Sequence, residues 1–128
     1  MHYPDKSLKF SFIIPVFNRP DEIQELLESI VLQTEKDFEV IVVEDGSNIK
    51  CDKIISHYSD KLNISYFFKE NSGPGDSRNY GMRNAKGNYF LILDSDCILP
   101  PEYMKEVKKS LSQEYVDCFG GVDAALDI

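Results

Sequence analysis

Two aspartates, Asp94 and Asp96, lie two residues apart in the run LILDSDC, Leu91 to Cys97, where an apolar strand is expected to end. In a strand, residues i and i+2 project from the same side, roughly 6.5 to 7 Å apart. Like charges held that close repel each other, and a cation between them relieves the repulsion. Hard divalent ions such as Mg2+ and Mn2+ prefer carboxylate oxygens. The pair therefore indicates a metal site, although a solvated strand end carrying two acids is an equally good interpretation of this triplet alone.

The segments around this pair alternate between strand and helix patterns. Strands are predicted at Phe10 to Phe17, Phe38 to Val43, Asn63 to Phe68, Asn88 to Leu93 and Val116 to Val122. Helices are predicted from Pro20 through Val31, Cys51 to Ser59, Asp76 to Ala85, and Pro100 and Pro101 to Ser112. A turn is expected from Glu44 to Asn48 and a loop from Asn71 to Gly75. The alternation predicts a single α/β domain over residues 1–128, with a parallel, doubly wound sheet and right-handed crossovers.

Polar side chains follow the end of each of the first four predicted strands. In chain order these are Asn18 and Arg19, Glu44 and Asp45, Glu70 and Asn71, and Asp94 and Asp96. Ligands of open parallel sheets bind beyond the carboxyl ends of the strands, at a topological switch point. We therefore expect these clusters to converge on one site.

Composition limits the class of protein. The 128 residues suffice for one domain, and 42% hydrophobic and 12% aromatic residues are typical of a globular chain with a real core. The formal net charge of -8 argues against binding to nucleic acid or to an anionic membrane surface. A site for phosphate in so acidic a chain needs help from a cation.

The cysteines and the hydropathy pattern predict a location. Cys51, Cys97 and Cys118 match neither a zinc site nor a redox pair, so reduced structural thiols are expected. No signal peptide is recognisable, and no apolar stretch approaches the ~20 residues of a membrane helix. We expect a cytoplasmic protein, although a longer parent could be attached to the cytoplasmic side of a membrane.

The usual phosphate-binding motifs are missing from the chain. There is no GxxxxGK[ST] and no GxGxxG after the first strand. Positive charge for a phosphate would then come from a divalent ion on Asp96 and Asp94, from Arg78, and from the amino end of the helix after the loop Gly73 to Gly75. The alternatives are that this loop only turns the chain and that Arg78 is a surface or structural ion-pair residue.

Three strings together carry a resemblance to a known family. FSFIIPVFNRPDEIQELLESI, DFEVIVVEDGS and NSGPGDSRNYGMRNAKGNYFLILDSDC closely resemble, in order and spacing, the nucleotide-binding half of family 2 glycosyltransferases with the GT-A fold. The resemblance covers about Phe10 to Pro101. It implies a Rossmann-like, mainly parallel sheet whose first four strands have the order 3-2-1-4. It also implies a nucleotide diphosphate sugar as donor, most often linked to uridine, and a glycan, lipid-linked or protein acceptor.

The resemblance also implies roles for individual residues. Pro15 and Phe17 would line the pocket for the base, and Asp45 would accept a hydrogen bond from it. Asp94 would approach the ribose and the metal, and Asp96 would coordinate a Mn2+ or Mg2+ ion that bridges the diphosphate. The full set of implied nucleotide contacts is Pro15, Phe17, Asn18, Asp45, Asn71, Arg78 and Asp94.

The chain departs from the family pattern in two places. Glu44 stands where the family usually has the first aspartate of a DDGS turn. The sequence also stops at Ile128, before the acceptor-binding half whose aspartate is the catalytic base in this family. Three late acids, Asp117, Asp123 and Asp127, are better explained as part of a solvated strand or tail. The resemblance thus implies the donor-binding part of an inverting, metal-dependent glycosyltransferase, inactive or weakly active in isolation, with its base beyond Ile128.

Three other classes stay open at this point. A receiver domain has a similar length and an acidic Mg2+ site, but it needs acids after the first strand and a lysine after the fifth. A nucleotidyltransferase that forms nucleotide sugars needs a glycine-rich, basic loop after the first strand, and PVFNRPDE is not one. A binding or assembly module without catalysis is the third, with self-association through the surface that the missing half would cover.

Overall fold

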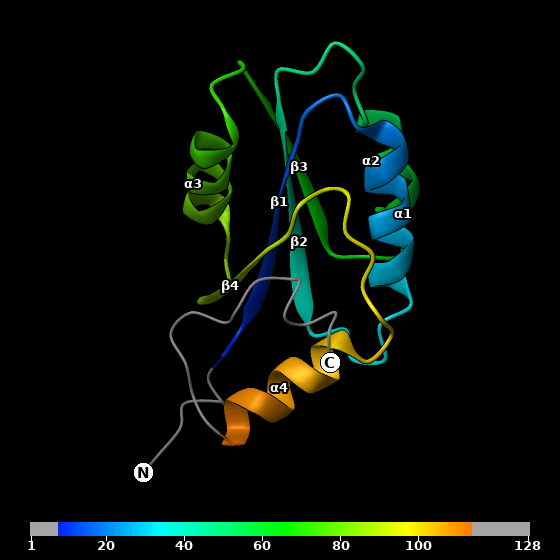
Figure 1. The fold of residues 1–128 in the computed structure, drawn as a ribbon, viewed down its shortest axis with the longest axis vertical. Helices are drawn as coiled ribbons and strands as arrows, with labels where there is room; N and C mark the ends of the chain where they lie inside the picture. The colour runs from blue at the N-terminus through cyan, green and yellow to red at the C-terminus, as the bar shows by residue number, and fades with distance from the viewer. Residues whose placement is uncertain (1–7, 114–128) are drawn as a thin grey trace.

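The computed structural model describes residues 8–113, which form a parallel sheet of four strands with helices on both of its faces (Figure 1). The strands are β1 (Phe10–Val16), β2 (Phe38–Asp45), β3 (Ile64–Lys69) and β4 (Tyr89–Ile92). The helices are α1 (Pro20–Val31), α2 (Asp52–Tyr58), α3 (Pro74–Asn84) and α4 (Tyr103–Gln113). The predicted strand from Val116 to Val122 lies outside the described residues.

The order of the strands is β3-β2-β1-β4, with every neighbouring pair parallel. This confirms the predicted order 3-2-1-4. The register aligns Phe10 of β1 with Phe38 of β2 and with Tyr89 of β4. Because all strands run the same way, the loops after their carboxyl ends meet at one edge of the sheet.

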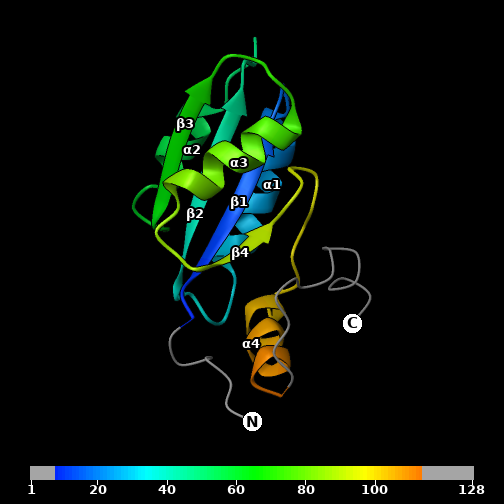
Figure 2. The same cartoon turned by 90° about the vertical axis from the view of Figure 1, so that its left-hand side faces the viewer.

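The two faces of the sheet are covered differently. Helices α1 and α2 lie on one face and α3 on the other, while α4 lies beyond the amino ends of the strands (Figure 2). Side chains alternate along β1 accordingly: Phe12 and Ile14 join the larger core, and Ile13 joins a smaller core with Ile41 and Val43.

Within residues 8–113, none of the helices has the length and apolar character needed to cross a membrane.

The limits of two elements differ from the sequence-based prediction in ways that matter for the site. Glu44 and Asp45 were expected in a turn, but both belong to β2 and are buried, because β2 stays paired with β1 through Glu44 and with β3 through Asp45. Helix α3 begins at Pro74, two residues earlier than predicted, with Gly73 before it at a φ of 99°. The glycine permits this left-handed entry into the helix.

Gly81 permits the close approach of α3 to the sheet. A Cβ atom at Gly81 would lie 2.7 Å from Cγ2 of Ile13 and 3.3 Å from Cγ2 of Val43. Gly81→Ala should therefore lower the free energy of unfolding by about 1–3 kcal/mol, measured by urea denaturation. The control is Gly75→Ala in the same helix, where nothing lies within 4 Å of the added atom. We expect that change to be neutral or to stabilise by up to about 1 kcal/mol, and equal losses in both variants would refute tight packing at Gly81.

Candidate functional site

A cavity of about 530 Å³ opens at the edge of the sheet where the carboxyl ends of the strands meet. Residues from the ends of β1, β2, β3 and β4 and from the start of α3 line it. Six of them are predicted nucleotide or metal contacts: Pro15, Phe17, Asp45, Asn71, Asp94 and Asp96. The other lining residues are Val16, Arg19, Glu22, Gly73, Pro74 and Ser95. At least one member of each predicted polar cluster lines this cavity, whereas Asn18, Glu44 and Glu70 do not.

Asp94 and Asp96 reach the cavity from a turn and not from a strand. β4 ends at Ile92, and the backbone N–H of Cys97 donates to the carbonyl oxygen of Asp94 at 3.1 Å, which closes a turn. The prediction that these two side chains are oriented by the alternation of a strand is therefore wrong. Both aspartates are exposed and line the same cavity, so the turn achieves the convergence that the strand was expected to give.

Asp45 is the most heavily bonded side chain of the cavity. Its Oδ1 accepts hydrogen bonds from Nζ of Lys69 at 2.7 Å and from the backbone N–H of Ser72 at 2.8 Å. Its Oδ2 accepts from the backbone N–H of Gly73 at 3.0 Å and, at 3.4 Å, from Nδ2 of Asn71. Nδ2 of Asn71 also donates to the carbonyl oxygen of Asp45 at 2.9 Å. One carboxylate thus joins the end of β2 to the loop between β3 and α3.

These bonds determine the charge of Asp45. Burial alone would raise the pKa of the carboxyl group, since a charge is poorly solvated there. The hydrogen bonds from Lys69 and from the amides of Ser72 and Gly73, together with the charge of Lys69, outweigh burial and lower the pKa from its ordinary value of 3.8. Asp45 is therefore ionised at neutral pH and offers only acceptors to the cavity.

Two of the predicted nucleotide contacts do not line this cavity. Oδ1 of Asn18 accepts hydrogen bonds from the backbone N–H groups of Asn48 and Ile49, at 2.8 and 3.0 Å, and the N–H of Asn18 donates to Oγ of Ser47 at 2.8 Å. Asn18 thereby ties the loop after β1 to the loop after β2. Arg78 is half-buried in α3, one turn after Pro74. Contacts of Asn18 and Arg78 with a nucleotide stay predictions.

Glu44, which departs from the family pattern, faces away from the cavity. Its Oε1 accepts hydrogen bonds from the backbone N–H of Cys51 at 2.9 Å, from Sγ of Cys51 at 3.4 Å, and from the hydroxyl of Tyr66 at 2.6 Å. Glu44 is fully buried and connects β2 to the start of α2 and to β3. Glu44 does not line the cavity, and its contacts are with these neighbouring elements.

The chemistry of the site fits a divalent ion that arrives with a phosphate ligand. Within residues 8–113, no three His, Cys, Asp or Glu side chains are grouped so as to hold a metal by themselves. Asp94 and Asp96 supply two carboxylates. Mg2+ is usually bound by one or two carboxylates together with substrate phosphates and water. Two carboxylates from the protein are therefore enough for such an ion.

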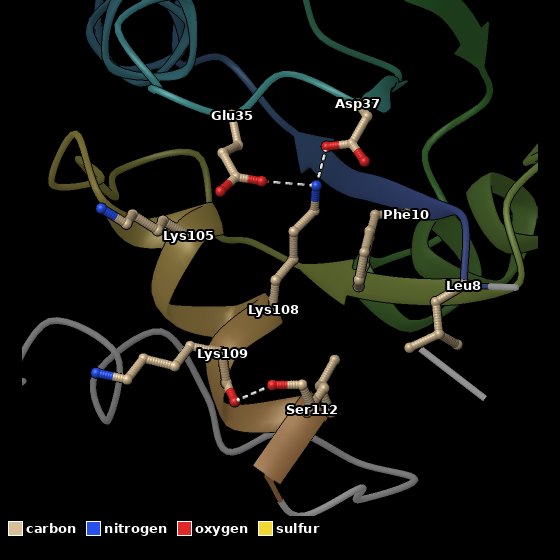
Figure 3. A pocket seen from close by; sticks show the side chains of 9 residues that line it. Leu8, Phe10, Glu35, Asp37, Lys105, Lys108, Lys109 and Ser112 are labelled. Atoms are coloured by element: carbon tan, nitrogen blue, oxygen red, sulfur yellow. Dashed lines mark hydrogen bonds and ion pairs between the residues drawn. The ribbon is translucent and has the colours of Figure 1, made fainter. Parts of the chain in front are cut away.

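A second cavity, of about 630 Å³, lies at the opposite end of the sheet (Figure 3). It is built around Lys108 of α4, whose Nζ donates to Glu35 at 2.8 Å and also to Asp37. Burial by itself would lower the pKa of Lys108, but the bonds to Asp37 and Glu35 outweigh it and raise the pKa. Lys108 and the two carboxylates of this second cavity thus pair with each other, and these bonds hold α4 against the segment between α1 and β2.

Comparison with known proteins places the chain in a family. The model of Glycosyl transferase family 2 matches residues 11–125. The chain belongs to this family. The receiver and nucleotidyltransferase alternatives are thereby set aside, and the resemblance noted in the sequence is confirmed.

Relatives of the chain are named as glycosyltransferases. An uncharacterized glycosyltransferase of Rickettsia typhi is 46% identical over 91 residues, which are 71% of this chain and 28% of that protein. Glycosyltransferase GlyA of Streptococcus pneumoniae is 34% identical over 110 residues, 85% of this chain and 16% of that protein. The poly(ribitol-phosphate) β-N-acetylglucosaminyltransferase TarS of Staphylococcus aureus is 34% identical over 114 residues and 20% of its length is covered. The chain therefore spans less than a third of each of these relatives.

Solved structures give the same fold. TarS 1-349 in complex with UDP-GlcNAc aligns with a TM-score of 0.79 and 35% identity, over 84% of this chain and 32% of that one. The mannosyltransferase PcManGT of Pyrobaculum calidifontis, in complex with GDP-Man and Mn2+, aligns with a TM-score of 0.79 over 91% of this chain and 36% of that one. Its identity is 23%, so this likeness concerns the fold alone. The family 2 chain has the GT-A architecture that the sequence predicted.

The lowered pKa of Asp45 predicts a pH dependence of stability. A carboxyl group with a lower pKa in the folded than in the unfolded chain stabilises the fold above the unfolded value and loses that contribution as pH falls through the folded value. The free energy of unfolding should therefore fall below about pH 4 as Asp45 takes a proton. Asp45→Asn should cost roughly 3 kcal/mol at neutral pH and show a shallower fall in acid, measured by denaturation across pH. An acid limb of equal steepness in both proteins would contradict this role of Asp45.

Proposed function

We propose that this family 2 chain is the donor-binding part of an inverting glycosyltransferase that uses a UDP-linked sugar and a divalent metal ion. The observation that carries the proposal is the cavity at the carboxyl end of the sheet. Asp45 lies there at the end of β2, Asn71 in the loop after β3, and Asp94 and Asp96 on the turn after β4. Its volume is in the range of roughly 300–1,000 Å³ that small-molecule sites occupy.

The base of the donor is assigned to the part of the cavity around Pro15, Phe17 and Asp45. Phe17 is about half exposed there, which leaves an aromatic face available for a planar ring. Asp45 is ionised and accepts hydrogen bonds only, which suits a base that carries a ring N–H, as uracil does. The relative TarS, solved with UDP-GlcNAc and with UDP, supports a uridine nucleotide.

The diphosphate is assigned to Asp94 and Asp96, which would hold the metal ion. When bound, a divalent ion supplies positive charge next to the negative charge that develops on the departing nucleoside diphosphate. The two aspartates are exposed on their turn and make the cavity acidic, so a diphosphate without a cation would be repelled. Binding of the nucleotide should therefore depend on the ion.

The acceptor hydroxyl is proposed to attack the anomeric carbon from the side opposite the diphosphate, with inversion. A carboxylate base takes the proton of that hydroxyl. We place the base outside the residues that the structure describes, because Asp94 and Asp96 face the phosphate side in this assignment. The acceptor, whether glycan, lipid-linked or protein, is likewise assigned to parts outside residues 8–113.

Titration of the chain with UDP in the presence of Mn2+, followed by calorimetry, tests the donor site. We expect saturable binding that weakens by about tenfold or more in Asp96→Asn, because the amide cannot replace a charged metal ligand. The control is Asp60→Asn, which removes one charge that is also exposed, between α2 and β3, and should change the affinity by less than about twofold.

Two outcomes would contradict the proposal in different ways. If UDP does not bind the folded wild-type chain, the assignment of the donor fails. If UDP binds equally well with Mn2+ and with a chelator, and equally well in Asp96→Asn, the nucleotide assignment stands and the metal role of Asp96 is refuted.

A further inference from the structure

Lys69 lies behind the cavity and makes no direct contribution to its lining. It is the last residue of β3, and the parallel register pairs it with Asp45 at the end of β2. Its side chain is 14% exposed and that of Asp45 is 5% exposed. The ammonium group donates to Oδ1 of Asp45 at 2.7 Å, to the carbonyl oxygen of Glu70 at 2.8 Å, and to Oγ of Ser72. All three of its protons are therefore used within the protein.

The bonds of Lys69 leave one accepting position of Asp45 available to a ligand. Oδ1 already has two donors, Nζ of Lys69 and the N–H of Ser72. Oδ2 has one short bond, from the N–H of Gly73 at 3.0 Å, and a long contact of 3.4 Å with Nδ2 of Asn71. A carboxylate offers about four accepting positions, so Oδ2 can take one more hydrogen bond from the cavity.

A hydrogen-bond acceptor fixed at Oδ2 of Asp45 would distinguish uracil from cytosine. The ring nitrogen N3 of uracil carries a proton and donates, whereas N3 of cytosine carries a lone pair and accepts. Against an ionised carboxylate, cytosine places acceptor against acceptor, and a buried polar group left without a partner is costly. Sites built to bond a particular N–H reject an analogue that lacks it.

We propose that Lys69 is a positioning residue for base selectivity, which keeps Asp45 an ionised acceptor aimed into the cavity, so that uridine diphosphate is bound and cytidine diphosphate is rejected. The inference rests on the proposed function, because it takes the nucleotide to occupy this cavity. Without Lys69 a carboxylate as buried as Asp45 would lack its cation. The Asp45 side chain would then take up a proton or turn toward solvent. After either change, the base no longer faces an ionised hydrogen-bond acceptor.

The test compares UDP with CDP in wild type and in Lys69→Met, each titrated with Mn2+ by calorimetry. Wild type should bind UDP more tightly than CDP. In Lys69→Met the affinity for UDP should fall by about tenfold, whereas that for CDP should stay the same or rise, because the carboxylate that opposes N3 of cytosine is withdrawn. The ratio of the UDP affinity to the CDP affinity should therefore fall by about tenfold or more.

Two further variants separate positioning from mere support of the fold. Lys69→Arg keeps the positive charge and should restore the UDP to CDP ratio to within about threefold of wild type. Lys50→Met removes an exposed lysine at the same end of the sheet, whose Nζ lies 4.5 Å from the centre of the Phe68 ring, and should leave both affinities within about twofold of wild type.

Ser72→Ala provides a variant that leaves the core intact, in case Lys69→Met does not fold. Ser72 is exposed, and its Oγ is one of the three acceptors of Lys69. We expect UDP binding to weaken by about two- to threefold with CDP unchanged. Thermal unfolding of each variant establishes that it is folded before titration.

The outcomes that overturn the inference differ from those that overturn the proposed function. A wild-type UDP to CDP ratio retained in folded Lys69→Met, or in Ser72→Ala if Lys69→Met is unfolded, refutes the role of Lys69 and leaves the donor site standing. Equal losses for UDP and CDP that Lys69→Arg does not restore would make Lys69 a structural support only. Absence of UDP binding to wild type would refute the donor site itself.

Discussion

The candidate site depends on one buried charge, the carboxylate of Asp45. A charge removed from water is tolerated only when it is paired and hydrogen-bonded, and Asp45 receives a cation and two backbone amides. Those amides belong to Ser72 and Gly73, so the same bonds that satisfy the charge hold the loop between β3 and α3 against β2. The wall of the cavity and the electrostatics of the cavity therefore have the same physical origin.

The two ends of the sheet use the same kinds of residues for different purposes. At the amino end, Lys108 is paired with Glu35 and Asp37, and these bonds fasten α4 to the rest of the domain. At the carboxyl end, Asp94 and Asp96 are exposed beside a cavity, and for neither does the structure of residues 8–113 show an ion pair. Acidic side chains without a protein cation, grouped at the end where parallel strands present their loops, are available to a ligand.

Much of the fold could be predicted from residue patterns. The apolar runs of β1 and β2 mark strands buried on both faces, and Pro20 with the apolar spacing of α1 marks a helix, because these patterns reflect local geometry. Strand ends were less predictable. Polar residues at Glu44 and Asp45 suggested a turn, whereas continued pairing with β1 and β3 keeps both in the sheet. Pairing between distant segments decides such limits, and it leaves no local signal.

The sequence by itself determined the class of the fold, the family, and six of the residues that line the cavity, since alternation, spacing and motif order are properties of the chain. Only the tertiary structure decided how the side chains at this end of the sheet are arranged. It showed that Asp94 and Asp96 line the cavity from a turn, that Asn18 ties two loops together, and that Lys69 is the partner of Asp45. The physical reason is that a hydrogen bond or an ion pair needs two atoms within about 3 Å, and register and crossovers bring such atoms together from segments far apart in the sequence.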